Sequence, residues 1–195
     1  MRERDFCNVC KRLSNAERWS VLRQVAISAD GFGSKVGDIS ANTHLGVSAT
    51  SQYLSQLEDE CGLVASRREG RYVCYEFVQD LEDPRAVELG AALRKHFRGG
   101  DGHGVLILPA LANEARVGVV AALRKAGRAT KTELQKMTGL TEINVRRHLG
   151  VMINVGLAEQ SGRGFSFVEP RDELAKLFLG LSLKYDSVRV TFYKK

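Results

Sequence analysis

The chain has 195 residues, of which 44% are hydrophobic and 27% are charged, a composition typical of a globular protein large enough to bury a core. It contains no apolar run near the roughly 18 residues of a membrane span, and residues 1–5 lack the apolar core of a signal peptide. We therefore expect a cytoplasmic protein of one or two domains that does not use a membrane as partner.

The net charge of +6 is concentrated in one half of the chain. Residues 111–195 hold 15 Lys and Arg and 8 Asp and Glu, a net charge of +7, whereas residues 1–80 hold 10 and 11, a net charge of −1. A basic half is typical of proteins that bind a polyanion, because neutralising phosphates drives nucleic-acid binding. A solvated basic surface gives the same count, so charge alone leaves both interpretations open.

The first predicted helix begins at the S-x-x-E capping box of Ser14 and Glu17, because apolar residues follow there at helical spacing. A short second helix is expected over about residues 35–42, with Ser34 as its cap. A turn over about residues 43–47 then leads into a third helix.

This third helix is predicted to end near Cys61, because Gly62 is suited to the left-handed stop of a helix. Two strand-like runs follow, residues 63–67 and 71–77, and the second alternates in the way a strand does. They are joined across residues 68–70, so we expect a β-hairpin.

A further helix is predicted to begin at Pro84, since proline is favoured in the first turn, and to run to about Phe97. The glycine-rich residues 99–104 then predict a flexible joint and the boundary between two domains.

The same plan of elements is predicted for the second half. Asn113 caps a first helix, the capping box of Thr130 and Glu133 opens a short second one, and Thr141 caps a third that ends at Gly156. A second hairpin is expected from residues 157–161 and 165–169, with its turn at residues 162–164.

After this hairpin, a final helix is predicted from Pro170 and a short terminal strand over residues 187–193. The chain thus holds two copies of one unit of about 65 residues, each with three helices followed by a hairpin. This pattern is typical of a winged helix-turn-helix. We predict a mostly α fold with small β-hairpin wings: a first winged-helix domain over residues 1–98, a linker over 99–104 and a second domain over 105–195.

Two segments resemble a known family. Residues 139–149, followed by Gly156 and Leu157, are similar to the recognition segment of ArsR/SmtB-type transcriptional repressors, and so are residues 62–64 with the basic stretch 67–71 in the first copy. The resemblance implies a sequence-specific regulator that binds double-stranded DNA.

The candidate DNA-binding residues lie on the predicted third helices and hairpin tips. A helix fits the major groove with its exposed face, where Arg, Asn and Gln read base edges, and basic hairpin tips grip phosphates or a minor groove. The candidates are Ser48, Ser51, Gln52, Tyr53, Arg67, Arg68, Arg71, Asn144, Arg146, Arg147, His148 and Arg163. The acidic residues 58–60 and Glu142 oppose this interpretation locally.

The family resemblance also implies two-fold pairing through first and last helices. We expect the helices from Pro84 and Pro170 to help form an internal pseudo-dimer, with the two recognition helices roughly 34 Å apart. The alternative is a homodimer that presents four modules.

The chain has four cysteines, Cys7, Cys10, Cys61 and Cys74, and no secretory signal, which argues against a disulfide framework. The C-x-x-C pair of Cys7 and Cys10 with the two others leaves open a cysteine-based metal or redox response, but a structural zinc usually needs four ligands. We expect no metal and no cofactor.

No motif of a catalytic serine, a metalloprotease or a phosphate-binding loop is present, so we expect no enzyme. Besides a DNA-binding regulator, one alternative of another class stays open: a scaffold that uses paired winged helices to dock proteins. Salt dependence separates the two, because phosphate binding weakens steeply as salt rises.

Overall fold

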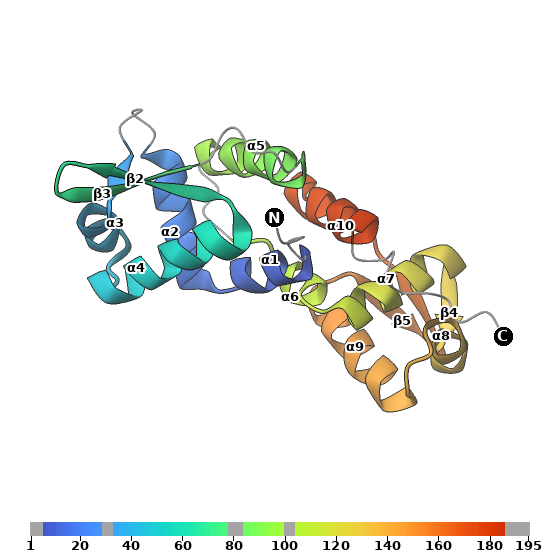
Figure 1. Cartoon of the computed structure of the whole chain (residues 1–195). Coiled ribbons are helices and arrows are strands. Elements are labelled where there is room, and N and C mark those ends of the chain that lie inside the picture. The colour runs from blue at the N-terminus through green and yellow to red at the C-terminus, as the bar shows by residue number, and fades with distance from the viewer. Residues whose placement is uncertain (1–5, 29–32, 78–83, 100–103, 186–195) are drawn as a thin grey trace. The chain divides into compact units, whose positions relative to one another are not determined.

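The computed structural model describes residues 6–28, 33–77, 84–99 and 104–185 (Figure 1). The fold is mostly helical with two small antiparallel sheets, as predicted. The chain divides into two compact units, one of Arg12–Gly104 and the other of Val105–Lys195 together with Asp5–Lys11. No helix in the described part of the chain is long and apolar enough to cross a membrane.

The first unit repeats most of the predicted elements and adds one strand. Its elements are α2 (Ala16–Ile27), β1 (Ser34–Lys35), α3 (Val36–Thr43), α4 (Val47–Gln56) with a π-helical last turn η1 (Leu57–Cys61), β2 (Val64–Glu69), β3 (Tyr72–Phe77) and α5 (Pro84–Arg98). Gly62 follows η1 with φ of 66°, the left-handed conformation expected at a helix stop.

The second unit has the same order of elements after one extra turn of helix. Its elements are α6 (Leu108–Leu111), α7 (Glu114–Ala126), β4 (Arg128–Thr130), α8 (Lys131–Thr138), α9 (Glu142–Asn154), β5 (Ala158–Ser161), β6 (Gly164–Phe167) and α10 (Glu173–Tyr185). The predicted terminal strand over residues 187–193 and most of the predicted joint, residues 100–103, lie outside the described residues.

Each sheet has three strands, with the last strand of the hairpin in the middle: the orders are β1-β3-β2 and β4-β6-β5. The sequence predicted the hairpins but not the third strands, because two or three residues are too few for an alternating pattern. Both hairpins turn over two residues, Gly70-Arg71 and Gly162-Arg163, and both glycines have φ of 59°. A left-handed first residue is typical of the type II′ hairpin turn.

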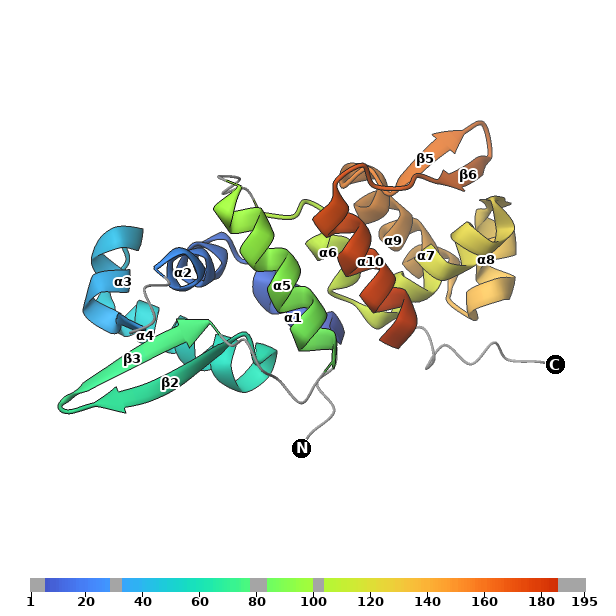
Figure 2. The same cartoon turned by 90° about the horizontal axis from the view of Figure 1, so that it is seen from above.

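The two hairpins differ in length. The first pairs six residues on each strand and the second pairs four, so the first hairpin extends further from its helices (Figure 2).

Helix starts differ from the prediction at three places. Asn15, not Ser14, caps α2 by accepting a hydrogen bond from the backbone of Arg18. Ser34 belongs to β1 and does not cap α3, because the sheet occupies its backbone. Pro170 does not open α10, which begins at Glu173 with the Asp172 carboxylate accepting from the backbone N–H of Ala175.

In contrast, three caps predicted for the second unit are confirmed. Asn113 and Thr141 each accept a hydrogen bond from the backbone N–H of the third residue of α7 and α9. Thr130 and Glu133 form the complete capping box of α8.

The N-terminal helix α1 (Phe6–Leu13) was not predicted, and the assignment of its residues to the first domain is wrong for those up to Lys11. They form part of the second unit, where the rings of Phe6 and Phe178 lie 6.0 Å apart. Cys10 is fully buried, with its Sγ 3.8 Å from the hydroxyl of Ser182 on α10. A helix of eight residues is too short to be stable alone, so packing on α10 holds it.

Candidate nucleic-acid interface

The helix α9 presents two arginines on its outer face. Arg146 and Arg147 are exposed, and Asn144 is half-buried. Val145, Leu149 and Met152 form the inner face and are fully buried. No carboxylate forms an ion pair with Arg146 or Arg147 in the described part of the chain, so their charges are available to an anion.

His148 does not lie on this outer face, and the expectation that it contacts DNA is wrong. Its side chain is 2% exposed. Position 148 lies three residues after Val145 and four before Met152, which is the spacing of one helix face. The same periodicity that identified the inner face therefore also predicts that His148 is buried.

The outer face of α4 is polar and uncharged. Ser48, Ser51 and Gln52 are exposed, as a groove-reading helix requires. Tyr53 is half-buried, and its hydroxyl donates a hydrogen bond to the carboxylate of Glu17. The guanidinium carbon of Arg18 lies 5.2 Å from the centre of the Tyr53 ring. The tip of Tyr53 is therefore already occupied by contacts within the unit.

The first hairpin carries the predicted arginines on its exposed end. Arg68 makes no hydrogen bond or ion pair with any described residue, whereas Arg67 pairs with Glu69 at 2.6 Å. Arg71, at the turn, donates to the Tyr72 hydroxyl at 2.7 Å. In the strand register Arg68 lies opposite Val73 and Arg67 opposite Cys74, so neighbouring arginines point to opposite faces of the hairpin.

The second sheet has two arginines, of which the sequence prediction named one, Arg163. Arg163 is exposed at the turn. Arg128 on β4 donates to the carbonyl of Ser161 at 2.8 Å and crosses Gly164 so closely that an added Cβ there would lie 2.5 Å from its Nε. Glycine at this position lets Arg128 brace the hairpin. A glycine directly after the turn is the sequence signal for this close approach.

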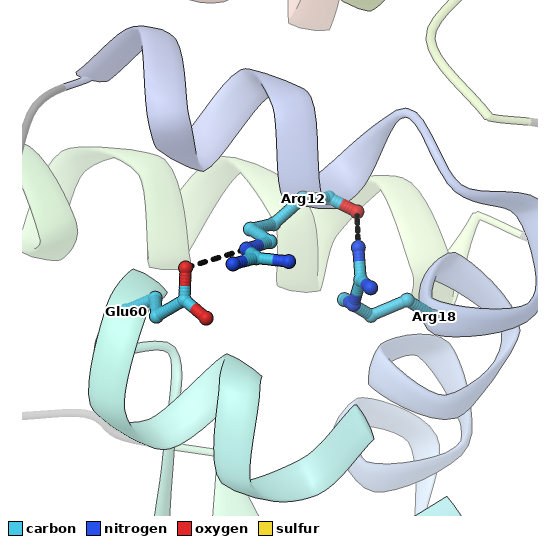
Figure 3. A network of polar contacts seen from close by, with 3 residues as sticks. All are labelled: Arg12, Arg18 and Glu60. Carbon is cyan, nitrogen blue, oxygen red and sulfur yellow. Dashed lines mark hydrogen bonds and ion pairs between the residues drawn. The ribbon is translucent and has the colours of Figure 1, made fainter. Parts of the chain in front are cut away.

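Two of the three acidic residues 58–60, Glu58 and Glu60, have structural partners. Glu58 accepts hydrogen bonds from the backbone and hydroxyl of Ser66, at 2.8 and 2.9 Å, and so ties η1 to the start of the hairpin. Glu60 forms an ion pair of 2.5 Å with Arg12 (Figure 3). These carboxylates therefore oppose a nearby phosphate less than the bare sequence implies.

Figure 3 also shows how Arg18 is held at the start of α2. Its guanidinium donates to the backbone carbonyl of Arg12 at 2.5 Å, and the residue is 7% exposed. Burial lowers the pKa of Arg18, and the charge of Arg12 lowers it further, while Tyr53 and Glu60 act in the opposite direction. Tyr53 and Glu60 therefore offset the cost of burying this charge only in part.

The second unit holds a similar arginine at the start of α7. The backbone of Arg116 donates to the cap Asn113 at 3.0 Å, and its guanidinium donates to the carbonyl of Pro109. Burial and the charge of Arg147 both lower the pKa of Arg116. Burial, Arg116 and Arg147 lower the pKa of His148, whose imidazole is therefore neutral near pH 7.

All four cysteines are buried and none is in a disulfide. Cys7 and Cys10 lie on α1, Cys61 ends η1, and Cys74 donates to Glu69 at 3.6 Å. Burial and this hydrogen bond raise the pKa of Cys74, which disfavours the reactive thiolate. Across the described ranges, no three His, Cys, Asp or Glu side chains gather into a group able to hold a metal ion.

Comparison with known proteins gives no match: no family model, curated protein or solved structure is significantly similar to this chain.

Proposed function

We propose that the chain is a sequence-specific, DNA-binding transcriptional regulator similar to the ArsR/SmtB type, with two winged helix-turn-helix domains in tandem. The observation that carries the proposal is the repeat of one arrangement in both units. A short helix and a longer one, α3 and α4 or α8 and α9, are joined by three residues and followed by a hairpin with arginine at its turn. Such a helix pair places its second helix in a major groove.

The exposed side chains support this role. Arg146 and Arg147 on α9 suit guanine edges or phosphates, and Gln52 on α4 suits adenine. Arg71 and Arg163 stand at the tips of the hairpins, where a wing meets the DNA backbone or minor groove. All of these interactions are hydrogen bonds and charge contacts, so the proposed role is to bind and orient DNA.

In this proposal the two units contact DNA with different elements. In the first, α4 is uncharged and the cations lie on the longer hairpin; in the second, the cations lie on α9 and the short hairpin carries one exposed arginine at its turn. The first unit thus contacts DNA chiefly through its β2–β3 hairpin, and the second contacts DNA chiefly through α9. We further propose that the helices α5 and α10 pair the units as an internal pseudo-dimer, in a cytoplasmic, nucleoid-associated protein.

One observation favours the scaffold alternative. Ile143 is 68% exposed on the outer face of α9, and an apolar side chain there suits a protein surface better than a phosphate backbone. It also suits the methyl group of thymine in a major groove. A protein-docking scaffold would bind duplex DNA weakly and without preference for the α9 arginines.

The proposal is tested by removing the charges on α9. We expect R146Q/R147Q to weaken binding of the full chain to a duplex of about 30 base pairs by at least about tenfold, because each lost phosphate or base contact is worth about 1–3 kcal/mol. Fluorescence anisotropy at fixed salt gives the affinities.

The matched control is R124Q/K125Q, which changes two exposed cations at the end of α7, of which Arg124 has an ion pair of 3.8 Å to Glu169. It removes the same charge from the same unit away from α9, and should change affinity by less than about twofold. Equal losses for the two variants would show general charge attraction and contradict a role for α9.

A further inference from the structure

The two units share one arrangement of hydrogen bonds at the start of their first long helix, α2 or α7. Asn15 and Asn113 each accept a hydrogen bond from the backbone of the third residue beyond, Arg18 or Arg116. Both guanidiniums donate back to a backbone carbonyl that precedes the cap, that of Arg12 or Pro109. One structural position is therefore filled by arginine in both repeats.

The recognition helices α4 and α9 place equivalent residues near this arginine. Fully buried Leu54 and Leu149 occupy the same place in α4 and α9, and so Tyr53 corresponds to His148 and Gln52 to Arg147. The Arg18 guanidinium lies over the Tyr53 ring, and α7, which carries Arg116, packs against α9.

The charge around the shared arginine differs between the units. In the first unit, Glu17 lies two residues after the cap and next to Arg18 in the sequence, and Glu60 forms an ion pair with Arg12. In the second unit, the residue corresponding to Glu17 is Ala115, while the acidic residue of this turn, Glu114, lies one position earlier on the helix, and Arg147 adds a second cation. Within the described residues no carboxylate pairs with Arg116 or Arg147.

The second site also has unused polar atoms. Nε of Arg116 is buried without a hydrogen-bond partner, as is Nε of Arg18 in the first unit, and the second site adds the buried, unpartnered Nδ1 of His148. Burial lowers the pKa of Arg116, and the charge of Arg147 lowers it further because the two guanidiniums repel each other. An anion placed between two such groups removes that repulsion and gains charge-assisted hydrogen bonds.

We propose that Arg116 and Arg147 together bind one phosphate of the DNA backbone in the second unit, at a position where the first unit carries its own carboxylates. Arg116, half-buried and fixed by its contact with Pro109, supplies a preorganised donor, and exposed Arg147 closes on the phosphate from α9. This inference rests on the proposed DNA-binding function and adds to it a residue that lies outside the recognition helix.

The test restores the missing carboxylate. A115E places a glutamate where the first unit has Glu17, in the first turn of α7, where acidic side chains favour helix formation. We expect A115E to weaken duplex binding about tenfold and to reduce the slope of log affinity against log salt by about 0.9, the value for one phosphate contact. A merely structural residue would not change this slope.

The matched control is A126E, which adds the same charge at an exposed alanine at the far end of α7. It should leave the slope unchanged. A second measurement uses inorganic phosphate alone: at equal ionic strength, phosphate in place of chloride should raise the melting temperature of the wild-type chain and of A126E, but not of A115E.

The outcomes separate the two proposals. If DNA binds and A115E and A126E lower affinity and slope equally, the phosphate site is refuted while DNA binding stands. If the chain binds no DNA at low salt, the proposed function fails, and stabilisation by phosphate that A115E abolishes would still assign the anion site. Absence of both effects refutes both.

Discussion

Replacing Phe6 by alanine is expected to release α1 from the second unit. Phe6 is 3% exposed, and its ring packs against Phe178 with centroids 6.0 Å apart and planes at 40°. Truncating a buried phenylalanine to alanine costs about 3–5 kcal/mol, of which the aromatic pair accounts for about 0.5–1.5 kcal/mol. Because α1 has eight residues and depends on packing, this loss should appear as local opening.

The thiols of α1 report that opening directly. Cys7 and Cys10 are 4% and 0% exposed, so a thiol reagent reaches them in the native chain when α1 leaves its site. A loss of about 4 kcal/mol raises the open population about a thousandfold, and the labelling rate of both cysteines should rise by a similar factor. Cys61 and Cys74 belong to the first unit and should keep their wild-type rates, which peptide mass spectrometry of the labelled chain distinguishes.

The control is L106A, because Leu106 is 81% exposed in the same unit and its truncation should change no rate. Fluorescence of the single tryptophan, Trp19, which is buried in the first unit, should stay unchanged in both variants. If F6A labels Cys7 and Cys10 no faster than L106A does, α1 does not depend on Phe6 and the packing argument is refuted.

Two further predictions concern the second unit. G164A should lower the free energy of unfolding by about 0.5–1.5 kcal/mol in urea titrations, because the new Cβ moves the exposed side chain of Arg128 away from its hydrogen bond with the Ser161 carbonyl, and the effect should vanish in an R128A background; persistence there would show that Arg128 is not the cause. Burial lowers the pKa of His148, and the charges of Arg116 on α7 and Arg147 on α9 lower it further, which implies that folding keeps the imidazole neutral. The unfolded chain binds that proton near its ordinary pKa of about 6.5, so this stability is complete above that pH and is lost as the pH falls below it. The urea midpoint of the wild type should therefore fall more between pH 7.5 and 5.5 than that of H148Q, and equal falls would exclude His148 as the cause.

The sequence predicted those elements whose ends and faces have local signals. Thr130 with Glu133, Asn113 and Gly62 act within a few residues of themselves, so their roles follow from spacing alone. In contrast, α1 lacks a strong cap signal and is held by Phe178, which is far away in sequence. The strands β1 and β4 exist because a hairpin edge pairs with them, and a run of two or three residues cannot show this.

The candidate site was predictable in its exposed part and not in its buried part. Arg68, Arg146 and Arg147 were expected at the surface, and they lie there because arginine is rarely buried. The ability of histidine to contact bases and phosphates suggested an outward position for His148, whereas the helix period places it on the buried face. The role inferred for Arg116 rests on a comparison of two packed sites, Glu17 beside Arg18 against Ala115 beside Arg116, which needs tertiary contacts that no local pattern contains.

The salt dependence of binding between the full chain and duplex DNA tests the central proposal most directly. A groove-binding regulator with arginines from α9 and both hairpins should bind at low salt, and log affinity should fall linearly with log salt at about 0.9 for each phosphate contacted. With several contacts, affinity should drop by at least about a hundredfold between 50 and 200 mM salt. Affinity that is absent at 50 mM, or that stays constant across this range, would contradict the account.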